Sequence, residues 1–129
     1  MHEALFILYV KDQAVSTAFY ERVLDRAPRL NVPGMTEFAL NDGGVLGLMP
    51  EAGIKRLLGD TLPDPAKAHG IPRAELYLRV DDPAAYHARA LANGATELDG
   101  LRQRAWGDIA GYCLDLDGHV LAFAGVGVQ

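Results

Sequence analysis

One pattern of residues occurs twice in this chain of 129 residues. In the second copy Leu76, Leu78 and Val80 alternate with more polar residues, and Phe6, Leu8 and Val10 hold the matching positions in the first. In each copy an aspartate follows two positions after the valine, and a helical pattern begins after the aspartate. The two aspartates, Asp12 and Asp82, lie 70 positions apart, as do Val10 and Val80. Alternation at period two is typical of a half-buried strand, and an aspartate side chain caps the first turn of a helix. The sequence therefore predicts two copies of one strand–helix unit.

Each copy continues into further strands after its helix. Asp42-Gly43 and Asp117-Gly118 each lie between apolar runs, and the glycine allows the positive φ of a tight hairpin turn. In the first copy we expect a strand at 4–10, a helix at 14–24, a loop at 25–34 and two strands at 36–40 and 45–49. In the second copy we expect a strand at 75–80, a helix at 83–92, a short strand at 96–98 with a polar loop after it, and two strands at 111–115 and 119–124. Each copy is thus predicted to be a βαβββ module.

The predicted helices carry apolar residues at helical spacing. These residues are Val15, Phe19 and Val23 in the first copy and Ala84, Ala88 and Leu91 in the second. One face of each sheet is expected to take its helix, and the opposite face then needs a second sheet to cover it. We therefore predict an α+β fold in which two tandem βαβββ modules form a cupped, eight-stranded mixed sheet around a cleft.

The organisation of the chain follows from these modules. We expect a single domain over residues 1–129, because a chain of this length buries about two-thirds of its unfolded surface. The first module spans 1–50 and the second spans 74–126. Residues 51–73 are interrupted by prolines and glycines, so they are predicted to be a linker with a short helix near Ile54. This linker is longer than a passive connection needs, so we expect it to cover a surface or to contact a partner.

Charge and cysteine content exclude several classes of protein. The net charge is −5 and the lysines and arginines form no cluster, which argues against nucleic-acid binding. Cys113 is the only cysteine, so an internal disulfide framework and a multi-thiolate metal site are excluded. The apolar run near the N-terminus ends at Lys11, too early to cross a bilayer, and no membrane partner is expected. These features are typical of a cytoplasmic globular protein.

Several segments resemble the vicinal-oxygen-chelate superfamily, which includes glyoxalases, extradiol dioxygenases, fosfomycin-resistance thiol transferases and bleomycin-resistance proteins. The segments are LYVKDQAVSTAFYERVL in the first copy, and LRVDDPAAYHARALANGA, WGD at 106–108 and LDLDGHVLAF in the second. The resemblance covers nearly the whole chain apart from 51–73. It implies paired βαβββ modules, often assembled as a homodimer, and a divalent metal held by His or Glu side chains on the first and last strands of each module.

The resemblance also implies four metal-binding positions, which fall here on Leu5, Gly47, Glu75 and Ala122. Only Glu75 has a side chain that binds metals, and a catalytic divalent ion needs about three protein ligands. We therefore expect no metal and no other cofactor. This departure from the family pattern removes the basis for the metal-dependent activities of the family.

The candidate ligand site lies on the predicted cleft side of the second module. Its first strand places Glu75, Tyr77 and Arg79 on that side. The matching residues of the first module are Leu5, Ile7 and Tyr9, which form a more apolar surface. The candidate ligand-binding residues are Glu75, Trp106, Tyr9, Tyr77, Tyr112 and Arg79.

Two interpretations stay open for these residues. Glu75 is either a cleft carboxylate that accepts a cation or acts as a general base, or a solvated residue paired with Arg73 or Arg79. Trp106, the only tryptophan, either stacks on a flat ligand or fills the core. The tyrosines either line the cleft or close it in an inert protein. His87, like the other histidines, has no partner at metal-ligand spacing and is expected to be structural or solvated.

The function that these features favour is small-molecule binding without a metal. The resemblance to bleomycin-resistance proteins implies that the chain holds an antibiotic or related metabolite, aromatic or cationic, and lowers its free concentration. A homodimer is expected. The alternative is an enzyme of the glyoxalase, isomerase or dioxygenase type, with a non-standard metal site or with acid–base chemistry at Glu75. A third interpretation is an interaction module whose cleft is filled by its own side chains.

Overall fold

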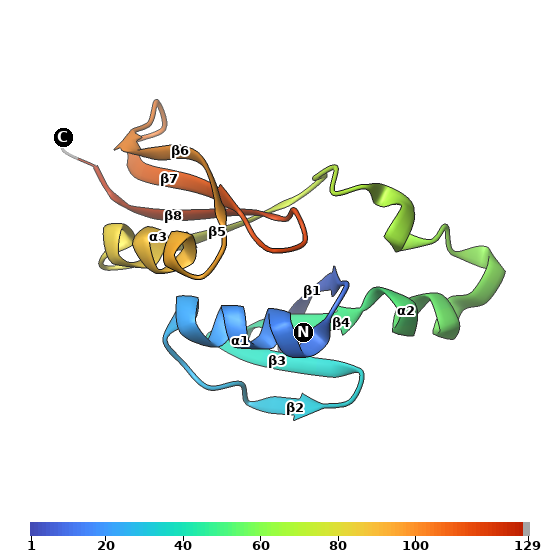
Figure 1. The fold of residues 1–129 in the computed structure, drawn as a ribbon. Helices are drawn as coiled ribbons and strands as arrows, with labels where there is room; N and C mark the ends of the chain where they lie inside the picture. Colours follow the sequence, from blue (N-terminus) through green and yellow to red (C-terminus); the bar gives the residue numbers. More distant parts are fainter. Residues whose placement is uncertain (128–129) are drawn as a thin grey trace. The chain divides into compact units, whose positions relative to one another are not determined.

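The computed structural model describes residues 1–127 of the chain (Figure 1). The described chain forms two compact units, one made of 1–21 and 25–69 and the other of 22–24 and 70–127. Each unit contains one four-stranded sheet. No helix within the described residues is long and apolar enough to cross a membrane.

The first unit has the sheet order β1-β4-β3-β2. Its strands and helix are β1 (Ala4–Val10), α1 (Gln13–Leu24), β2 (Leu30–Val32), β3 (Met35–Asn41) and β4 (Gly44–Pro50). β1 is parallel to β4, and β3 pairs antiparallel with both β2 and β4. The helix α2 (Glu51–Leu58) and two short 3₁₀ helices, η1 (Gly59–Thr61) and η2 (Pro65–Ala68), follow. The short helix expected near Ile54 is therefore α2.

The second unit repeats this order of elements. They are β5 (Glu75–Arg79), α3 (Pro83–Ala92), β6 (Thr96–Gln103), β7 (Asp108–Leu114) and β8 (Val120–Val126). The sheet order is β5-β8-β7-β6, with β5 parallel to β8 and β7 antiparallel to both β6 and β8. The α+β class and the two tandem βαβββ modules are thus confirmed. The eight strands form two four-stranded sheets, and the curvature of both sheets around a common cleft stays a prediction.

Both sheet-covering helices begin where the sequence predicts. The Oδ1 atoms of Asp12 and Asp82 accept hydrogen bonds from the backbone N–H groups of Val15 and Ala85, each at 3.1 Å. Pro83 occupies the first position of α3, where its missing N–H costs no intrahelical bond. The repeated aspartate in the sequence is therefore a repeated helix cap in the structure.

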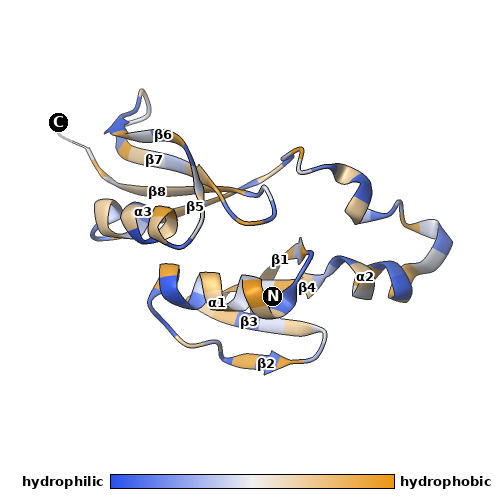
Figure 2. Cartoon of the chain, viewed as in Figure 1, coloured by the Kyte–Doolittle hydropathy of each residue, from blue (hydrophilic) through white to orange (hydrophobic). Residues whose placement is uncertain are grey.

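The buried faces of these helices differ from the predicted ones. Phe19 and Val23 are buried as expected, but Val15 is 53% exposed. In α3, Ala84 and Ala88 are exposed. Figure 2 shows hydrophobic and hydrophilic residues mixed along both α1 and α3. The spacing of apolar residues therefore predicted the buried face of each helix only in part.

Polar residues occupy the buried positions instead. Thr17 of α1 is buried, and its Oγ1 lies 2.8 Å from Oγ1 of Thr36 on β3. His87 of α3 is buried, and its Nε2 lies 2.9 Å from a carboxylate oxygen of Glu97 on β6. Each helix is thus joined to its sheet by a hydrogen bond, which hydrophobic periodicity does not detect.

Three strands differ from the prediction by three or more residues. β7 begins at Asp108, three residues before the predicted start at 111. β2 lies within 25–34, which was predicted to be a loop; three residues are too few to show alternation. A side chain secures this strand, since Nε2 of Gln13 donates to the Val32 carbonyl at 2.8 Å. β6 runs to Gln103, beyond the predicted 96–98. It is the outer strand of its sheet and pairs irregularly with β7, so its polar residues do not show a regular alternation.

Candidate functional site

Four predicted site residues share one face of the second sheet. Glu75, Tyr77 and Arg79 alternate along β5, and alternate residues of a strand point to the same side. Tyr77 is paired with Ala122 of β8, and Ala122 is paired on its other side with Tyr112 of β7. The two tyrosines therefore flank a buried alanine on the face opposite α3.

Trp106 joins this face through a chain of hydrogen bonds. Its indole Nε1 donates to the hydroxyl of Tyr77 at 2.9 Å, and that hydroxyl donates to Oδ2 of Asp108 at 2.6 Å. The same Oδ2 accepts from Nε of Arg79 at 3.0 Å. The Arg79 guanidinium lies 5.5 Å from the centroid of the Tyr77 ring, which is 6.5 Å from the Trp106 ring. We call these four residues the Trp106–Arg79 array. Together with Glu75 and Tyr112 they form the aromatic face.

The array fixes protonation states as well as geometry. The hydrogen bonds from Tyr77 and Arg79 lower the pKa of Asp108 below its ordinary value. Burial and the hydrogen bond to Asp108 raise the pKa of the Tyr77 hydroxyl. At neutral pH the array therefore holds a carboxylate anion bound to a neutral phenol and to a guanidinium cation.

The outer ends of the array are open to solvent. Trp106 is 57% exposed and the Arg79 side chain 70% exposed, whereas the Asp108 side chain between them is 13% exposed. The interpretation of Trp106 as core filler is therefore wrong. An indole held at the surface by a hydrogen bond to a half-buried tyrosine has a defined orientation and a free ring face.

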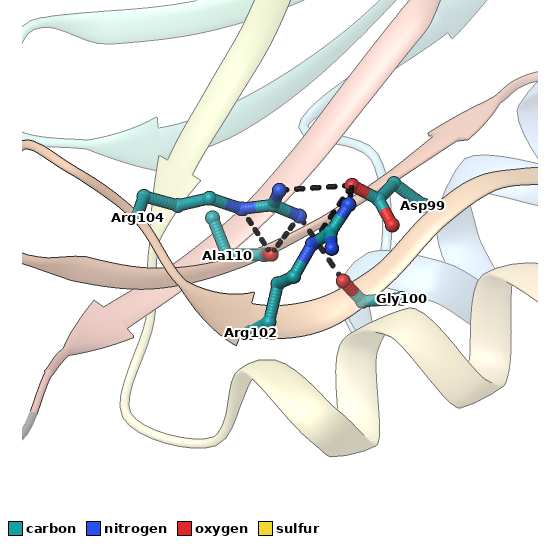
Figure 3. A network of polar contacts seen from close by, with 5 residues as sticks. All are labelled: Asp99, Gly100, Arg102, Arg104 and Ala110. Atoms are coloured by element: carbon teal, nitrogen blue, oxygen red, sulfur yellow. Dashed lines mark hydrogen bonds and ion pairs between the residues drawn. The ribbon is translucent and has the colours of Figure 1, made fainter.

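Arg104 supports the other side of the aromatic face (Figure 3). Its guanidinium donates to the carbonyl oxygens of Gly100 and Ala110 and to Oδ2 of Asp99, at distances of 2.7–3.1 Å. Its side chain is 12% exposed and lies 5.0 Å from the centroid of the Tyr112 ring. Because every nitrogen of the guanidinium donates within the unit, Arg104 positions Tyr112 rather than offering a free cation.

Glu75 lies at the start of β5, on the Tyr112 side of the face. No ion-pair partner for it is present among residues 1–127, so the pairing with Arg73 or Arg79 is not formed; Arg79 pairs with Asp108 instead. Burial and the negative charge of Glu75 raise the pKa of the Tyr112 hydroxyl. Glu75 is therefore an open carboxylate at the edge of the aromatic face.

Tyr9 belongs to the other unit, on β1. The aromatic face belongs to the second unit, so the placement of Tyr9 beside that face stays a prediction. The site that the structure describes lies wholly on the second module.

Two residues of the site were missed by sequence reasoning. Asp108 connects the array, and the available signal was its place in the WGD segment, two positions after the only tryptophan. Arg104 was missed because its role depends on a turn: the Arg104 N–H donates to the Asp108 carbonyl at 2.7 Å, and the Gly107 N–H donates to the Arg104 carbonyl at 3.1 Å. That turn brings Trp106 back over β5.

The family's metal positions do not fit a metal in this chain. A side chain at Gly47 would begin 2.9 Å from Cγ1 of Ile7, so the place of a ligand is filled by an apolar neighbour. Ala122 is fully buried between the two tyrosines. Within residues 1–127, no group of three or more His, Cys, Asp or Glu side chains is placed to hold an ion. Among the four family positions, Glu75 is therefore the single residue whose side chain binds metals.

His87 of α3 and Cys113 of β7 lie on the opposite side of the sheet, which α3 covers. His87 uses Nε2 on Glu97, and its buried Nδ1 has no hydrogen-bond partner among residues 1–127. Cys113 is fully buried, and burial together with nearby negative charge raises the pKa of its thiol to about 11. A protonated, inaccessible thiol is unreactive at neutral pH. Both residues therefore serve packing.

Comparison with known proteins agrees with this architecture. A sequence model of the Glyoxalase/Bleomycin resistance protein/Dioxygenase superfamily matches residues 3–123. The chain belongs to this superfamily. A search of curated proteins finds no significant match to the chain.

Solved structures share the fold of this superfamily member. A glyoxalase-related enzyme from Fulvimarina pelagi has a TM-score of 0.79 at 23% identity, covering 95% of this chain and 86% of its own. A glyoxalase/bleomycin resistance protein/dioxygenase family enzyme from Burkholderia phytofirmans has a TM-score of 0.79 at 16% identity, covering 95% and 96%. Protein ATC0852 from Agrobacterium tumefaciens has a TM-score of 0.74 at 26% identity, covering 99% of both chains. These likenesses describe the fold, and the function has to come from the site.

Proposed function

We propose that this protein binds a flat aromatic small molecule on the aromatic face, without a metal, and acts by holding that molecule. The observation that carries the proposal is the Trp106–Arg79 array. It holds an exposed indole in one orientation before any ligand arrives, through a hydrogen bond to Tyr77. Ordering a contact residue in advance reduces the entropy that binding must otherwise remove.

Sequestration of an antibiotic or a related metabolite is the form of binding that the family membership favours. The superfamily includes bleomycin-resistance proteins, and the positions where its enzymes would hold a metal are Leu5, Gly47 and Ala122 in this chain, with Glu75 alone able to bind one. A protein of this kind lowers the free concentration of its ligand in proportion to the number of binding sites. The ligand should be recovered chemically unchanged after release.

The direct test is a titration of Trp106 fluorescence with aromatic and cationic antibiotics. Trp106 is the only tryptophan, so the emission reports the aromatic face alone. Tyr77→Phe removes the hydroxyl that orients the indole and should weaken binding and reduce the fluorescence response. Tyr86→Phe is the matched control, because Tyr86 lies on α3 against Phe123, on the opposite side of the sheet. Equal affinity in wild type and Tyr77→Phe would contradict the proposed site.

An enzyme of the glyoxalase or dioxygenase type is the alternative, and it requires a metal or acid–base chemistry at Glu75. The protein would be stripped with chelator and melted alone and with Ni²⁺, Zn²⁺, Mn²⁺ and, without oxygen, Fe²⁺. A specific site filled at about a thousand times its Kd adds about 4 kcal/mol of stability. We expect no such rise with any ion. A rise for one ion, or turnover of the bound compound, would favour the enzyme.

We also expect the protein to form a homodimer, with 51–73 as a contact segment. Sedimentation velocity across a dilution series measures the assembly directly. Ligand should change Trp106 emission at constant protein concentration, whereas dilution alone should not. A change on dilution alone would place Trp106 at the contact between subunits rather than in the ligand site.

A further inference from the structure

We propose that the ligand of the aromatic face is a zwitterion: a flat aromatic molecule with an anionic group at one end, held by Arg79, and a cationic group at the other, held by Glu75. This inference rests on the proposed function and names the chemical class of its ligand. It follows from the two charged groups on the face whose bonding capacity is not used within the unit.

Arg79 provides the anion-binding end. Its bond to Asp108 uses Nε, and its two terminal nitrogens make no hydrogen bond within residues 1–127. The side chain is 70% exposed, so those nitrogens are accessible. A guanidinium binds a carboxylate through two parallel N–H donors, and fixing one edge of the group on Asp108 leaves the fork aimed in a limited range of directions.

Glu75 provides the cation-binding end. It lies on the same face of β5, four residues before Arg79, which corresponds to about 13 Å between the two Cα atoms. Its carboxylate has no ion-pair partner among residues 1–127. Its negative charge already acts across the edge of the face, where it raises the pKa of Tyr112.

The surface between these two ends is aromatic. Tyr77 lies between them on the strand, Tyr112 lies one strand beyond Ala122, and Trp106 is bonded to Tyr77. A cationic ligand would pair with Glu75 and leave the two terminal nitrogens of Arg79 without an acceptor, and an anionic ligand would use those nitrogens and leave Glu75 without an ion-pair partner within residues 1–127. A zwitterion binds in a single orientation, because reversing it would place like charges together at both ends.

The experiment uses four quinolones of one ring system, measured by titration calorimetry against the full-length protein. The parent, ciprofloxacin, carries a carboxylate and a piperazinium at opposite ends of a fused ring. Its ester keeps only the cation, an analogue without the amine keeps only the anion, and the ester of that analogue has neither charge. We expect ciprofloxacin to bind most tightly and the uncharged ester most weakly.

Two variants separate the contributions of the two ends. Arg79→Gln should weaken the two carboxylate-containing quinolones about 10- to 100-fold more than it weakens the two esters, as expected for a lost charged hydrogen bond. Glu75→Gln should weaken the two piperazinium compounds more than it weakens the other two. Arg56→Gln and Glu21→Gln make the same charge changes at exposed positions of the first unit and should affect none of the four.

The outcomes distinguish this inference from the function on which it rests. If all four quinolones bind equally to wild type, or if Arg79→Gln weakens all four equally, the zwitterion inference is overturned while aromatic binding stands. If none of the four changes Trp106 emission or releases heat, the inference is overturned, and the antibiotic titration decides the proposed function. Partial recovery of carboxylate binding by Arg79→Lys would support a direct contact.

Discussion

The two modules have the same sheet order and the same helix cap, but they use matching positions differently. On β1, Ile7 is paired with Gly47 of β4; at the matching place, Tyr77 of β5 is paired with Ala122 of β8. The first module fills the space over its small residue with an aliphatic side chain. The second covers its small residue with tyrosines that carry a hydrogen-bonded array. The same sheet arrangement therefore has an apolar face in one copy and a face with aromatic and charged side chains in the other.

The helix-facing sides of the sheets differ in a related way. Thr17 and His87 occupy the same place in their helices, 70 positions apart, and face Thr36 and Gly111 respectively. Each of these strand residues is paired with the matching residue of the module's last strand. The first module thus uses two medium side chains joined by a hydrogen bond, and the second uses one large ring over a glycine. The two modules therefore fill matching places between helix and sheet with different residues.

The largest expected effect tests whether the His87 ring requires a glycine at position 111. A Cβ at Gly111 would lie 2.9 Å from Nδ1 of His87 and 3.2 Å from Cγ of Leu101. His87 is buried between α3 and the sheet, so its ring has little room to move away from a new methyl group. Gly111→Ala should therefore destabilise the protein by about 2–3 kcal/mol through overpacking. Chemical denaturation measures the loss.

A double variant sharpens the comparison. His87→Thr with Gly111→Thr recreates in the second module the threonine pair of the first, and it should be clearly more stable than Gly111→Ala alone. If Gly111→Ala is as stable as wild type, the His87 ring has room to shift. The glycine at 111 would then not be required by the large side chain on the helix.

A smaller effect is expected from the threonine pair of the first module. Thr36 is fully buried, and its hydroxyl contacts Gln13 at 2.9 Å and Thr17 at 2.8 Å. Thr36→Val should cost about 1–2 kcal/mol, because Thr17 and Gln13 lose their partner in a buried place. Thr17→Val should cost less, since Thr36 keeps Gln13 and Asn31.

The double variant Thr17→Val with Thr36→Val controls for the unpaired hydroxyl. It should cost less than the sum of the two single changes, because neither buried donor is then left without an acceptor. Additive losses by denaturant unfolding would mean that the two hydroxyls do not depend on one another, and that the first module is not held by this pair.

The sequence was sufficient for the fold because each module is specified by local signals. The caps at Asp12 and Asp82 and the Asp-Gly turns act over a few residues, and the repeat confirms each reading by a second copy. Long-range hydrogen bonds were not accessible in this way. Thr17 meets Thr36 across 19 positions, and His87 meets Glu97 across a helix end. Neither contact follows from hydrophobic periodicity, so the buried helix faces were partly wrong.

Strand alternation predicted that Glu75, Tyr77 and Arg79 share one side of a strand, and β5 has this alternation. That these residues bind a ligand stays a prediction. The link between β5 and Trp106 depends on the turn at 104–108 and on Asp108, whose partners lie 29 and 31 positions away. Only the folded backbone brings these groups within hydrogen-bond distance.

The smallest expected effect is on the pH dependence of stability, and it compares one carboxylate from each module. Asp108 and Glu3 both have a pKa lowered by hydrogen-bonded partners, Tyr77 followed by Arg79 for Asp108 and Arg29 for Glu3. A carboxyl whose pKa is lower in the folded protein stabilises it fully above the unfolded pKa and loses that contribution as the pH falls through the folded pKa. Stability should therefore fall below about pH 4 in part through these two groups.

The two carboxylates should respond differently to salt. The Asp108 side chain is 13% exposed and bonded to both a phenol and a guanidinium, whereas the Glu3 side chain is 41% exposed and bonded to a guanidinium alone within residues 1–127. Melting curves between pH 2 and 5 should show a shallower acid loss for Asp108→Asn at both low and high salt. For Glu3→Gln the difference should disappear at high salt, because ions screen an exposed pair. A salt response of Asp108→Asn equal to that of Glu3→Gln would mean that Asp108 is no more protected than a surface residue. The second module would then have no advantage over the first in holding a fixed negative charge at its surface.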